Sequence, residues 1–440
     1  METFLAFLVL IGILVWVHEL GHFTFAKLFG VKVEVFSIGF GPPIIQKRWG
    51  ETVYQIALLP LGGYVKLYGE EDDEEARRDP RSFYAKPPWQ RILIAAAGPL
   101  FNFLFAILVF WVVFLKPQEV PAYLLKPPVV ERVEPGSLAE KVGLKPGDRI
   151  VAVDGKPVRS WEELDRLLRW KVGEEVVLTV ERNGKPINLK VRLSFDVLAK
   201  GLGLEQPLPP VVGRVLEGSP AQQVGLKPGD RILEVNGVPV EDWRQLVKLI
   251  RENGSKPLTL KVERDGKVFT VTVVPEVKKL PDGREVPILG IAPKVEFVEK
   301  KLSPLEALKA AVEQTLFLSY LTLKTLWGLI TGEVSIKTLG GPIAIADFAG
   351  EAAKAGLWTF LSAMGVLSVQ LGLFNLLPLP VLDGGMIVLT LIEWIWGRPL
   401  PKTFKEWWFK IGFALIVSFM IFIIVQDLVR LLTTGEAFPR

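Results

Sequence analysis

The stretch TFLAFLVLIGILVWVHELGH, residues 3–22, joins an uninterrupted apolar run to a pair of histidines. His18 and His22 are the only histidines among 440 residues, and the chain has no cysteine. Four residues apart on a helix, their side chains fall on one face about one turn apart, which suits two ligands of one zinc ion. Glu19 completes the H-E-x-x-H pattern, in which the glutamate activates a water molecule at the metal.

The location of this motif argues against a chance match. Residues 3–17 are apolar throughout, and the motif continues the same helical run. At about 1.5 Å per residue, His18 lies roughly 22 Å along the helix, inside a hydrocarbon core about 30 Å thick. Ionisable residues at that depth are costly and are usually functional. The run lacks the basic start and the cleavage site of a signal peptide, so we expect it to stay as a membrane helix.

The composition indicates a membrane protein with a sizeable soluble part. Half of the residues are hydrophobic and 23% are charged. A net charge of +4 is small for this length and does not favour nucleic acid as a partner. The absence of cysteine excludes disulfides and thiolate ligands. Any third protein ligand should therefore be a carboxylate.

Four strong apolar stretches are candidate membrane spans. They cover residues 3–25, 92–115, 358–396 and 411–425, and the third is broken by NLLPLPVLDGG at 375–385. Residues 304–331 are also apolar, but four charged residues interrupt them. We expect amphipathic helices there, lying on or between the spans, with a fifth span as the alternative.

Basic residues lie in the loop after the first span and in the loop before the fourth. The positive-inside rule places both loops in the cytoplasm, with both termini and residues 116–300 outside it. The residues concerned are Lys27, Lys32, Lys86, Arg91, Arg398, Lys402, Lys405 and Lys410.

Residues 31–68 have the pattern of strands. VKVEVF at 31–36 alternates apolar and polar side chains, and TVYQIALLPLGGYVKL at 52–67 follows the turn-forming residues GFGPP. We expect β-hairpins in a membrane-associated region. Non-helical backbone in a membrane must pack on protein or line water, so these strands could offer an edge to an extended substrate. An ordinary cytoplasmic sheet fits the pattern equally well.

The middle of the chain is an internal repeat. Residues 127–158 recur as residues 209–240, and both copies contain GLKPGDRI. Asp154-Gly155 and Asn236-Gly237 predict hairpins, and a short helical pattern follows a tryptophan in each copy. Both copies resemble circularly permuted bacterial PDZ domains. That resemblance implies α+β domains with a groove for peptide termini; capture of such termini and exclusion of bulky substrates both remain open.

The broken third span supplies a carboxylate. Prolines before Asp383 remove backbone donors, and Gly384 and Gly385 after it loosen the chain, so the helix should open there. An unwound segment inside a membrane normally lines a polar site. Together with His18 and His22, Asp383 would leave a fourth position for water, as a catalytic zinc requires.

Three motifs in this order resemble the site-2 protease family. They are HELGH at 18–22, GPLFN at 98–102 and NLLPLPVLDGG at 375–385. The tandem PDZ-like domains between the second and third spans resemble its bacterial regulator of sigma-E protease type. The resemblance covers essentially the whole chain and implies an intramembrane zinc metalloendopeptidase.

The resemblance also implies roles for individual residues. Zn²⁺ would be bound by His18, His22 and Asp383, with Glu19 as the catalytic glutamate. Substrate-positioning residues would be Asn375, Asn102, Gly98 and Pro99.

We therefore expect a multi-pass α-helical membrane protein with four spans, a broken third helix, a membrane-associated β-hairpin region and two inserted α+β PDZ-like domains. The expected segments are the first helix at 1–30, the β region at 31–90, the second helix at 91–116, the repeat domains at 117–200 and 201–300, amphipathic helices at 301–355, the broken helix at 356–397, and a loop, last helix and tail at 398–440.

The implied setting is the bacterial inner membrane, with periplasmic PDZ-like domains. The implied substrates are single-span membrane proteins, namely anti-sigma factors, signal-peptide remnants or both, cut during regulated proteolysis. The competing functions are a non-proteolytic, membrane-anchored PDZ scaffold and a metal transporter. The scaffold would not need Glu19, and a transporter should carry more carboxylates within its spans.

Overall fold

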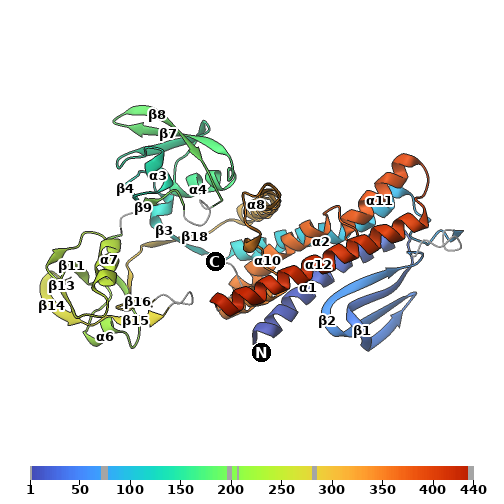
Figure 1. Ribbon diagram of the computed structural model, residues 1–440, viewed down its shortest axis with the longest axis horizontal. Helices are drawn as coiled ribbons and strands as arrows, with labels where there is room; N and C mark the ends of the chain where they lie inside the picture. Colours follow the sequence, from blue (N-terminus) through green and yellow to red (C-terminus); the bar gives the residue numbers. More distant parts are fainter. Residues whose placement is uncertain (1, 71–77, 196–200, 206–207, 280–284, 435–440) are drawn as a thin grey trace. The chain divides into compact units, whose positions relative to one another are not determined.

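The computed structural model describes residues 2–70, 78–195, 201–205, 208–279 and 285–434. The chain forms two compact units (Figure 1). One unit combines Met1–Pro117 with Lys301–Arg440, and the other is Gln118–Lys300. The second unit is therefore an insertion into the first along the chain. The tail expected at the C-terminus lies, from residue 435, outside the described residues.

Four helices of the described chain are long and apolar enough to cross a membrane, which confirms the number of spans predicted. These are α1 (Glu2–Leu28), α2 (Pro88–Leu115), α10 (Leu357–Asn375) and α12 (Lys402–Thr434). After α10 the chain breaks at residues 376–382 and continues as α11 (Asp383–Trp396). The break falls where the prolines and glycines predicted it.

The helices α1 and α2 pack so closely that their backbones are in contact. A Cβ placed on Gly21 of α1 would overlap the carbonyl group of Ala97 in α2. Lipid tails are as apolar as leucine, so helices in a membrane associate through close packing of small residues rather than through the hydrophobic effect. Gly21 therefore allows α1 to lie directly against the face of α2 that carries Gly98.

A buried ion cluster fixes α11. Glu393 of α11 accepts a hydrogen bond from Arg91 of α2 at 2.8 Å and pairs with Lys405 of α12 at 2.5 Å. All three side chains are less than a tenth exposed. Removing one partner from such a cluster leaves uncompensated charge, so it ties α11 to both neighbouring helices.

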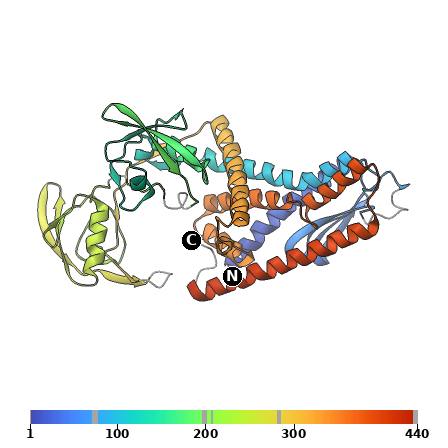
Figure 2. The ribbon, with the colours of Figure 1, turned by 45° about the horizontal axis from the view of Figure 1, so that its top comes forward.

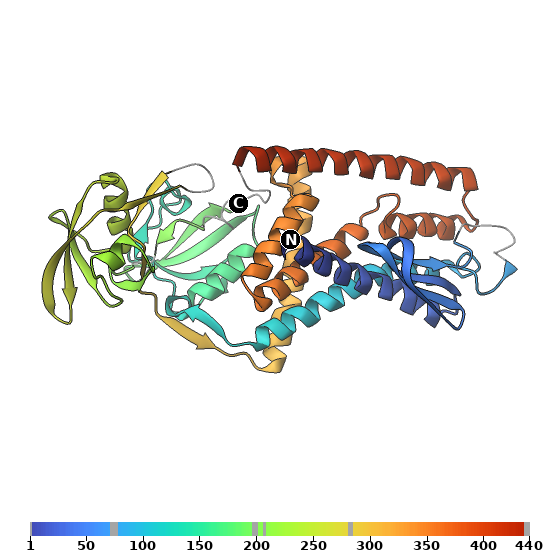
Figure 3. The same cartoon turned by 90° about the horizontal axis from the view of Figure 1, so that it is seen from below.

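The segment expected to hold amphipathic helices forms one long helix, α8 (Pro304–Thr331), then a 3₁₀ turn, η3 (Ile336–Thr338), and α9 (Pro342–Lys354). Ser303 and Glu306 form a reciprocal capping box at the start of α8. The helix α8 contacts α2 and α10 and crosses them steeply instead of running along them (Figures 2 and 3). It is not among the four helices that meet the criteria for a span.

The predicted β region forms two long bent strands, β1 (Val33–Trp49) and β2 (Thr52–Leu67). Each strand contributes two segments to an antiparallel arrangement in the order 43–49, 52–57, 33–38 and 63–67. Gly39 and Gly41, with φ near 90°, make the bend in β1. Apolar side chains at the bend and along the outer segment are exposed, namely Phe40, Ile44, Ile45, Trp49, Ile56, Leu58 and Leu59.

The inserted unit contains two copies of one α+β arrangement. Each copy has a four-stranded antiparallel sheet, in the orders β6-β5-β7-β8 and β12-β11-β13-β14. The first copy comprises β4 (Arg132–Val133), α3 (Leu138–Lys141), β5 (Arg149–Val153), β6 (Lys156–Pro157), α4 (Trp161–Arg169), β7 (Glu175–Arg182), β8 (Lys185–Arg192) and β9 (Leu204–Glu205). The second comprises β10 (Val212–Val215), α6 (Pro220–Gln223), β11 (Arg231–Val235), β12 (Val238–Pro239), α7 (Trp243–Asn253), β13 (Leu258–Arg264), β14 (Lys267–Val273), β15 (Glu276–Lys279), β16 (Glu285–Ile288) and β17 (Ile291–Pro293).

Two connecting strands enclose the copies. The strand β3 (Gln118–Pro121) pairs with β18 (Phe297–Lys300), and a 3₁₀ turn, η2 (Ala122–Leu125), follows β3. The predicted hairpin turns are present in both copies: Asp154 and Asn236 have φ near 50°, and each is followed by a glycine with positive φ. This is the backbone that Asn-Gly and Asp-Gly turns supply.

The expected boundary between the copies, at residue 200, is wrong. Leu204 in β9 pairs with Val133 of the first copy, just as Ile291 in β17 pairs with Val215 of the second. Each copy thus closes with a late strand that returns to its first strand. The constant shift of 82 residues ends before these strands, because the second copy carries a longer segment there, and so the sequence repeat could not place the boundary.

Each copy also contains a buried ion pair at the repeated GLKPGD motif. Arg182 donates two hydrogen bonds to the fully buried Asp148, at 2.6 and 2.7 Å, and the backbone N–H of Lys145 donates a third. Burial alone raises the pKa of Asp148, but these hydrogen bonds outweigh it and hold the pKa below its usual range. Asp230 and Arg264 repeat the arrangement in the second copy.

We predict that Asp148→Asn loosens the first copy, because Arg182 loses its buried counter-ion. Amide exchange in β5 and β7 should become at least about tenfold faster. Because the folded pKa is depressed, the stabilisation is fully present above about pH 4 and is lost as the pH falls through the folded value. Hydrogen–deuterium exchange of the full-length protein across this pH range measures both effects.

The matched control is Asp165→Asn, which removes the acidic partner of a different ion pair within the same copy. Asp165 and Arg169 pair at 2.7 Å, but both side chains are more than half exposed. Exchange should then change by less than about threefold. Equal effects of the two substitutions would contradict the importance of burial at Asp148.

Candidate metal centre

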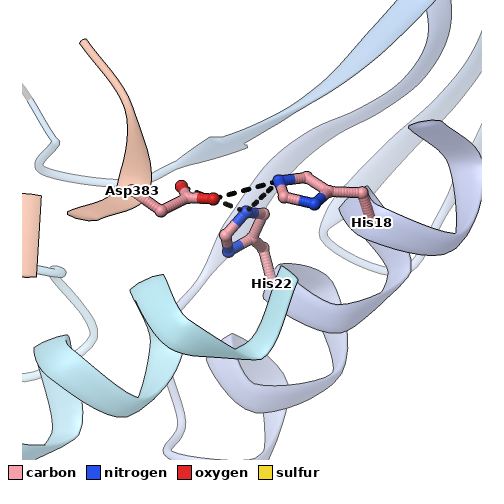
Figure 4. A group of neighbouring side chains, drawn as sticks. All are labelled: His18, His22 and Asp383. Atoms are coloured by element: carbon pink, nitrogen blue, oxygen red, sulfur yellow. Dashed lines mark hydrogen bonds and ion pairs between the residues drawn. The ribbon is translucent and has the colours of Figure 1, made fainter. Parts of the chain in front are cut away.

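The helix α1 presents His18 and His22 toward the same point. Their Nε2 atoms lie 3.2 Å apart, and the rings meet edge to face (Figure 4). His18 is 7% exposed and His22 is half-buried. The spacing of four residues therefore brings the two imidazole nitrogens together, as the sequence predicted.

Asp383 meets the two imidazoles from the first turn of α11. Its Oδ2 lies 3.0 Å from Nε2 of His18, and its Oδ1 lies 3.4 Å from Nε2 of His22 (Figure 4). The break before it is tightly folded: a Cβ on Gly384 would overlap the carbonyl of Leu377. Val381, with φ 77°, has a left-handed backbone that a β-branched residue rarely adopts. The compact, strained turn thus places the carboxylate at the level of the histidines.

The helix α2 packs directly against both imidazoles. Nδ1 of His22 donates to the carbonyl oxygen of Ile94 at 2.8 Å, which leaves its Nε2 as the free acceptor. Gly98 lies one turn further along α2, and a Cβ there would overlap Nε2 of both histidines. Only glycine leaves room for the pair of rings against this helix.

The three side chains fit a small divalent cation. Tetrahedral zinc with ligands at about 2.0–2.1 Å sets its donor atoms roughly 3.3 Å apart. The two Nε2 atoms here are 3.2 Å apart, and each faces a different oxygen of Asp383, at 3.0 and 3.4 Å, so these contacts are close to that spacing. Within the described residues this is the one group of three His, Asp or Glu side chains whose donor atoms converge in this way.

Glu19 lies next to the cluster, on the side of the sheet. Its half-buried carboxylate interacts with the charges of His18, His22 and Asp383 and with the backbone N–H of Val65 in β2. The same strand approaches through Gly63, where a Cβ would lie 3.5 Å from Cγ of Glu19. The glutamate therefore stands between the candidate metal ligands and the edge of the sheet.

The other residues expected at the site take different positions. Asn102 is fully buried, and its Nδ2 lies 3.0 Å from Nδ1 of His18. Pro99 is buried beside Gly98, and its carbonyl faces Gly372 of α10. Asn375 ends α10 and donates back to the carbonyl of Leu371 at 2.9 Å. Substrate positioning by these residues remains a prediction.

Sequence reasoning missed two backbone groups at this centre. The carbonyl of Ile94 orients His22, and the N–H of Val65 faces Glu19. Every residue carries these groups, so no residue type could mark them; only the packing of α2 and β2 on α1 selects them.

The sequence of the chain also matches a known protein family. The sequence model of Peptidase family M50 matches residues 6–419. The chain belongs to peptidase family M50. It is an intramembrane zinc metalloprotease. This activity argues against the two competing functions, a non-proteolytic scaffold and a metal transporter.

Curated relatives match the protease over nearly its whole length. A Vibrio cholerae protein with the provisional name zinc metalloprotease is 39% identical to this chain. The match covers 98% of this chain and 99% of the Vibrio protein. The regulator of sigma-E protease RseP of Escherichia coli is 37% identical, covering 97% and 98%. The regulator of sigma E protease of Salmonella typhimurium is 36% identical over the same shares.

We predict that Gly98→Ala weakens zinc binding by the protease at least about tenfold, because the new methyl group must displace an imidazole. Zinc affinity is measured by competition with a chelator, using the purified full-length protein in detergent. Gly12→Ala in α1 is the matched control, since a Cβ there meets no atom within 4 Å. Equal zinc affinity in both variants would contradict the account of α2 as a close support.

Proposed function

We propose that His18, His22 and Asp383 hold the catalytic zinc and that Glu19 is the general acid and base of peptide hydrolysis. The observation that carries this assignment is the convergence of the three side chains: the two Nε2 atoms are 3.2 Å apart, and each faces one oxygen of Asp383, at 3.0 and 3.4 Å, which suits one tetrahedral ion. The Ile94 carbonyl supports it by holding His22 in the tautomer that a metal ligand needs.

In the proposed mechanism zinc, when bound, supplies a Lewis acid that polarises the scissile carbonyl and acidifies water. Glu19 takes a proton from the attacking water and delivers it to the nitrogen of the leaving amine. The backbone N–H of Val65 faces the Glu19 carboxylate from β2. The flanking helices α2 and α11 keep the imidazoles and Asp383 fixed while the proton moves.

We predict different outcomes for the two kinds of residue. Glu19→Gln keeps a carbonyl oxygen in place but cannot accept a proton, so zinc content should stay near one per chain while cleavage falls at least about 100-fold. His22→Ala or Asp383→Ala should lose zinc as well, because two protein ligands hold the ion poorly. Metal analysis and cleavage of a single-span substrate, measured on the same preparations, test the assignment. Equal zinc in all three variants would exclude it.

The sheet edge at residues 63–67 is the proposed docking strand for substrate. A transmembrane helix hides its peptide bonds within its own hydrogen bonds, so it must unwind before it can be cut. Pairing with an edge strand replaces those bonds. This edge lies beside Glu19, through Gly63 and Val65, and so would lead an extended chain past the cluster. The exposed apolar side chains of β1 and β2 suit a sheet in contact with lipid.

The proposed substrates are single-span membrane proteins. Two relatives are named for the regulation of sigma-E, which favours anti-sigma factors as one substrate class; signal-peptide remnants are the other. The basic loops support an orientation in the bacterial inner membrane with both termini and the inserted unit on the periplasmic side. Asn375, Gly98 and Pro99 remain candidates for positioning the substrate.

The two repeat copies are proposed to be PDZ domains that restrict access to the protease. A cavity of about 360 Å³ lies between α4 and residues 201–204 of the first copy. Trp161, Leu164 and Leu168 line it, and Arg244 of the second copy also borders it. A helix facing a late strand across such a cavity is the setting in which PDZ domains take extended peptides and their termini. The same two domains, outside the membrane, would exclude substrates that still carry bulky external domains.

The pairing of β3 with β18 allows a clean test of this filter. Pro121 and Phe297 are directly opposite, so residues 122–296 can be replaced by a two-residue Asn-Gly turn. We expect this protein to cut untrimmed substrates that the full-length enzyme spares, while cutting trimmed ones as before. Side-by-side cleavage of one substrate with and without its external domain gives the ratio. An unchanged ratio would rule out the filter.

A further inference from the structure

Asn102 occupies an unusual position behind the candidate metal centre. It lies in α2, two turns after Ile94 and one turn after Gly98, and its side chain is fully buried. Its Nδ2 is 3.0 Å from Nδ1 of His18, while its Oδ1 is buried without a hydrogen-bond partner. The amide nitrogen of Asn102 thus has a close neighbour, while its amide oxygen has none. A buried oxygen without a hydrogen bond costs free energy of folding.

The chemistry of His18 explains both features. An imidazole that binds a metal through Nε2 carries its proton on Nδ1, and that N–H needs an acceptor. The oxygen and nitrogen of an asparagine amide have nearly the same shape, so their assignment follows from the hydrogen bonds. With the amide turned over, Oδ1 accepts the Nδ1–H of His18 and is no longer orphaned.

A third helix contacts the backbone of Asn102. The hydroxyl of Ser368 in α10 donates to the backbone carbonyl of Asn102 at 2.8 Å, and both residues are fully buried. Asn102 therefore supports His18 much as the carbonyl of Ile94 supports His22. The two supports, Ile94 and Asn102, lie about one turn on either side of Gly98 along α2.

We propose that Asn102 is a positioning residue for the zinc ligand His18, with Oδ1 accepting the Nδ1–H of the imidazole, rather than a residue that contacts substrate. This inference rests on the proposed assignment of His18 as a ligand. It places Asn102 on the Nδ1 side of the ring, whereas Asp383 and the cluster lie on the Nε2 side.

The test compares Asn102→Leu with Asn102→Asp in the full-length, zinc-loaded protein. Leucine fills similar space but accepts no hydrogen bond, so zinc affinity should fall about 10–100-fold. Aspartate restores an acceptor, so the affinity should return to within a few-fold of wild type. Chelator competition gives the affinity, and nitrogen-15 labelling of the two histidines shows directly whether the Nδ1–H of His18 is held.

Ser368→Ala is the matched control, because it removes a buried hydrogen bond between α10 and the backbone of Asn102 and leaves the contact of the Asn102 side chain with His18 in place. Zinc affinity should then stay within about threefold. Unchanged affinity in Asn102→Leu, with altered KM for substrate, would overturn the proposal in favour of substrate positioning. Equal losses in all three variants would also overturn it, since they would indicate a general loosening of the helices.

A separate variant tells failure of this inference from failure of the ligand assignment. His18→Ala should lose zinc if His18 is a ligand. Zinc loss in His18→Ala combined with normal affinity in Asn102→Leu would refute only the role of Asn102. Normal zinc in His18→Ala would refute the ligand assignment itself.

Discussion

The direct contact between the backbones of α1 and α2 is the constraint on which the rest of the metal centre depends. Gly21 lets α1 approach the Ala97 carbonyl, and Gly98 leaves room for two imidazole rings. At this distance a main-chain carbonyl and a buried amide of α2 reach the Nδ1 atoms of His22 and His18. A larger side chain at either glycine would push the helices apart and separate the histidines from the groups that orient them.

Polar groups inside a membrane need partners, and several helices contribute to this centre. The histidines come from α1, their supports from α2, and Asp383 from the turn into α11. The cluster of Arg91, Glu393 and Lys405 anchors α11 further along its length. The break in the third span thus delivers a carboxylate to a fixed point instead of leaving a loose loop in the bilayer.

The sequence predicted the features that depend on residue type and spacing. Four apolar runs gave the spanning helices, and Pro378, Pro380 and Gly384 marked the break before α11. A count of two histidines and no cysteine reduced the search for a third ligand to carboxylates, and the structure brings Asp383 to the histidines. Asp-Gly and Asn-Gly pairs placed the hairpin turns.

Features set by packing could not be predicted in this way. The order of segments within β1 and β2 depends on bends at Gly39 and Gly41 whose size no pattern encodes. The predicted boundary between the two copies was wrong because the closing strand β9 lies beyond the region in which the copies keep a constant offset in sequence. Asn102 stood out in the sequence as part of GPLFN, but only its burial and its contact with Nδ1 of His18 separate support of the ligand from contact with substrate.

Zinc K-edge X-ray absorption of the purified, zinc-loaded protein would test the central claim most directly. The account predicts one zinc per chain with two imidazole nitrogens and at least one oxygen at about 2.0–2.1 Å. It also predicts that this signal is lost in His22→Ala, which should not retain the ion. A zinc bound by oxygen alone, or an unchanged spectrum in that variant, would contradict the assignment of the HELGH helix and Asp383 as the metal centre.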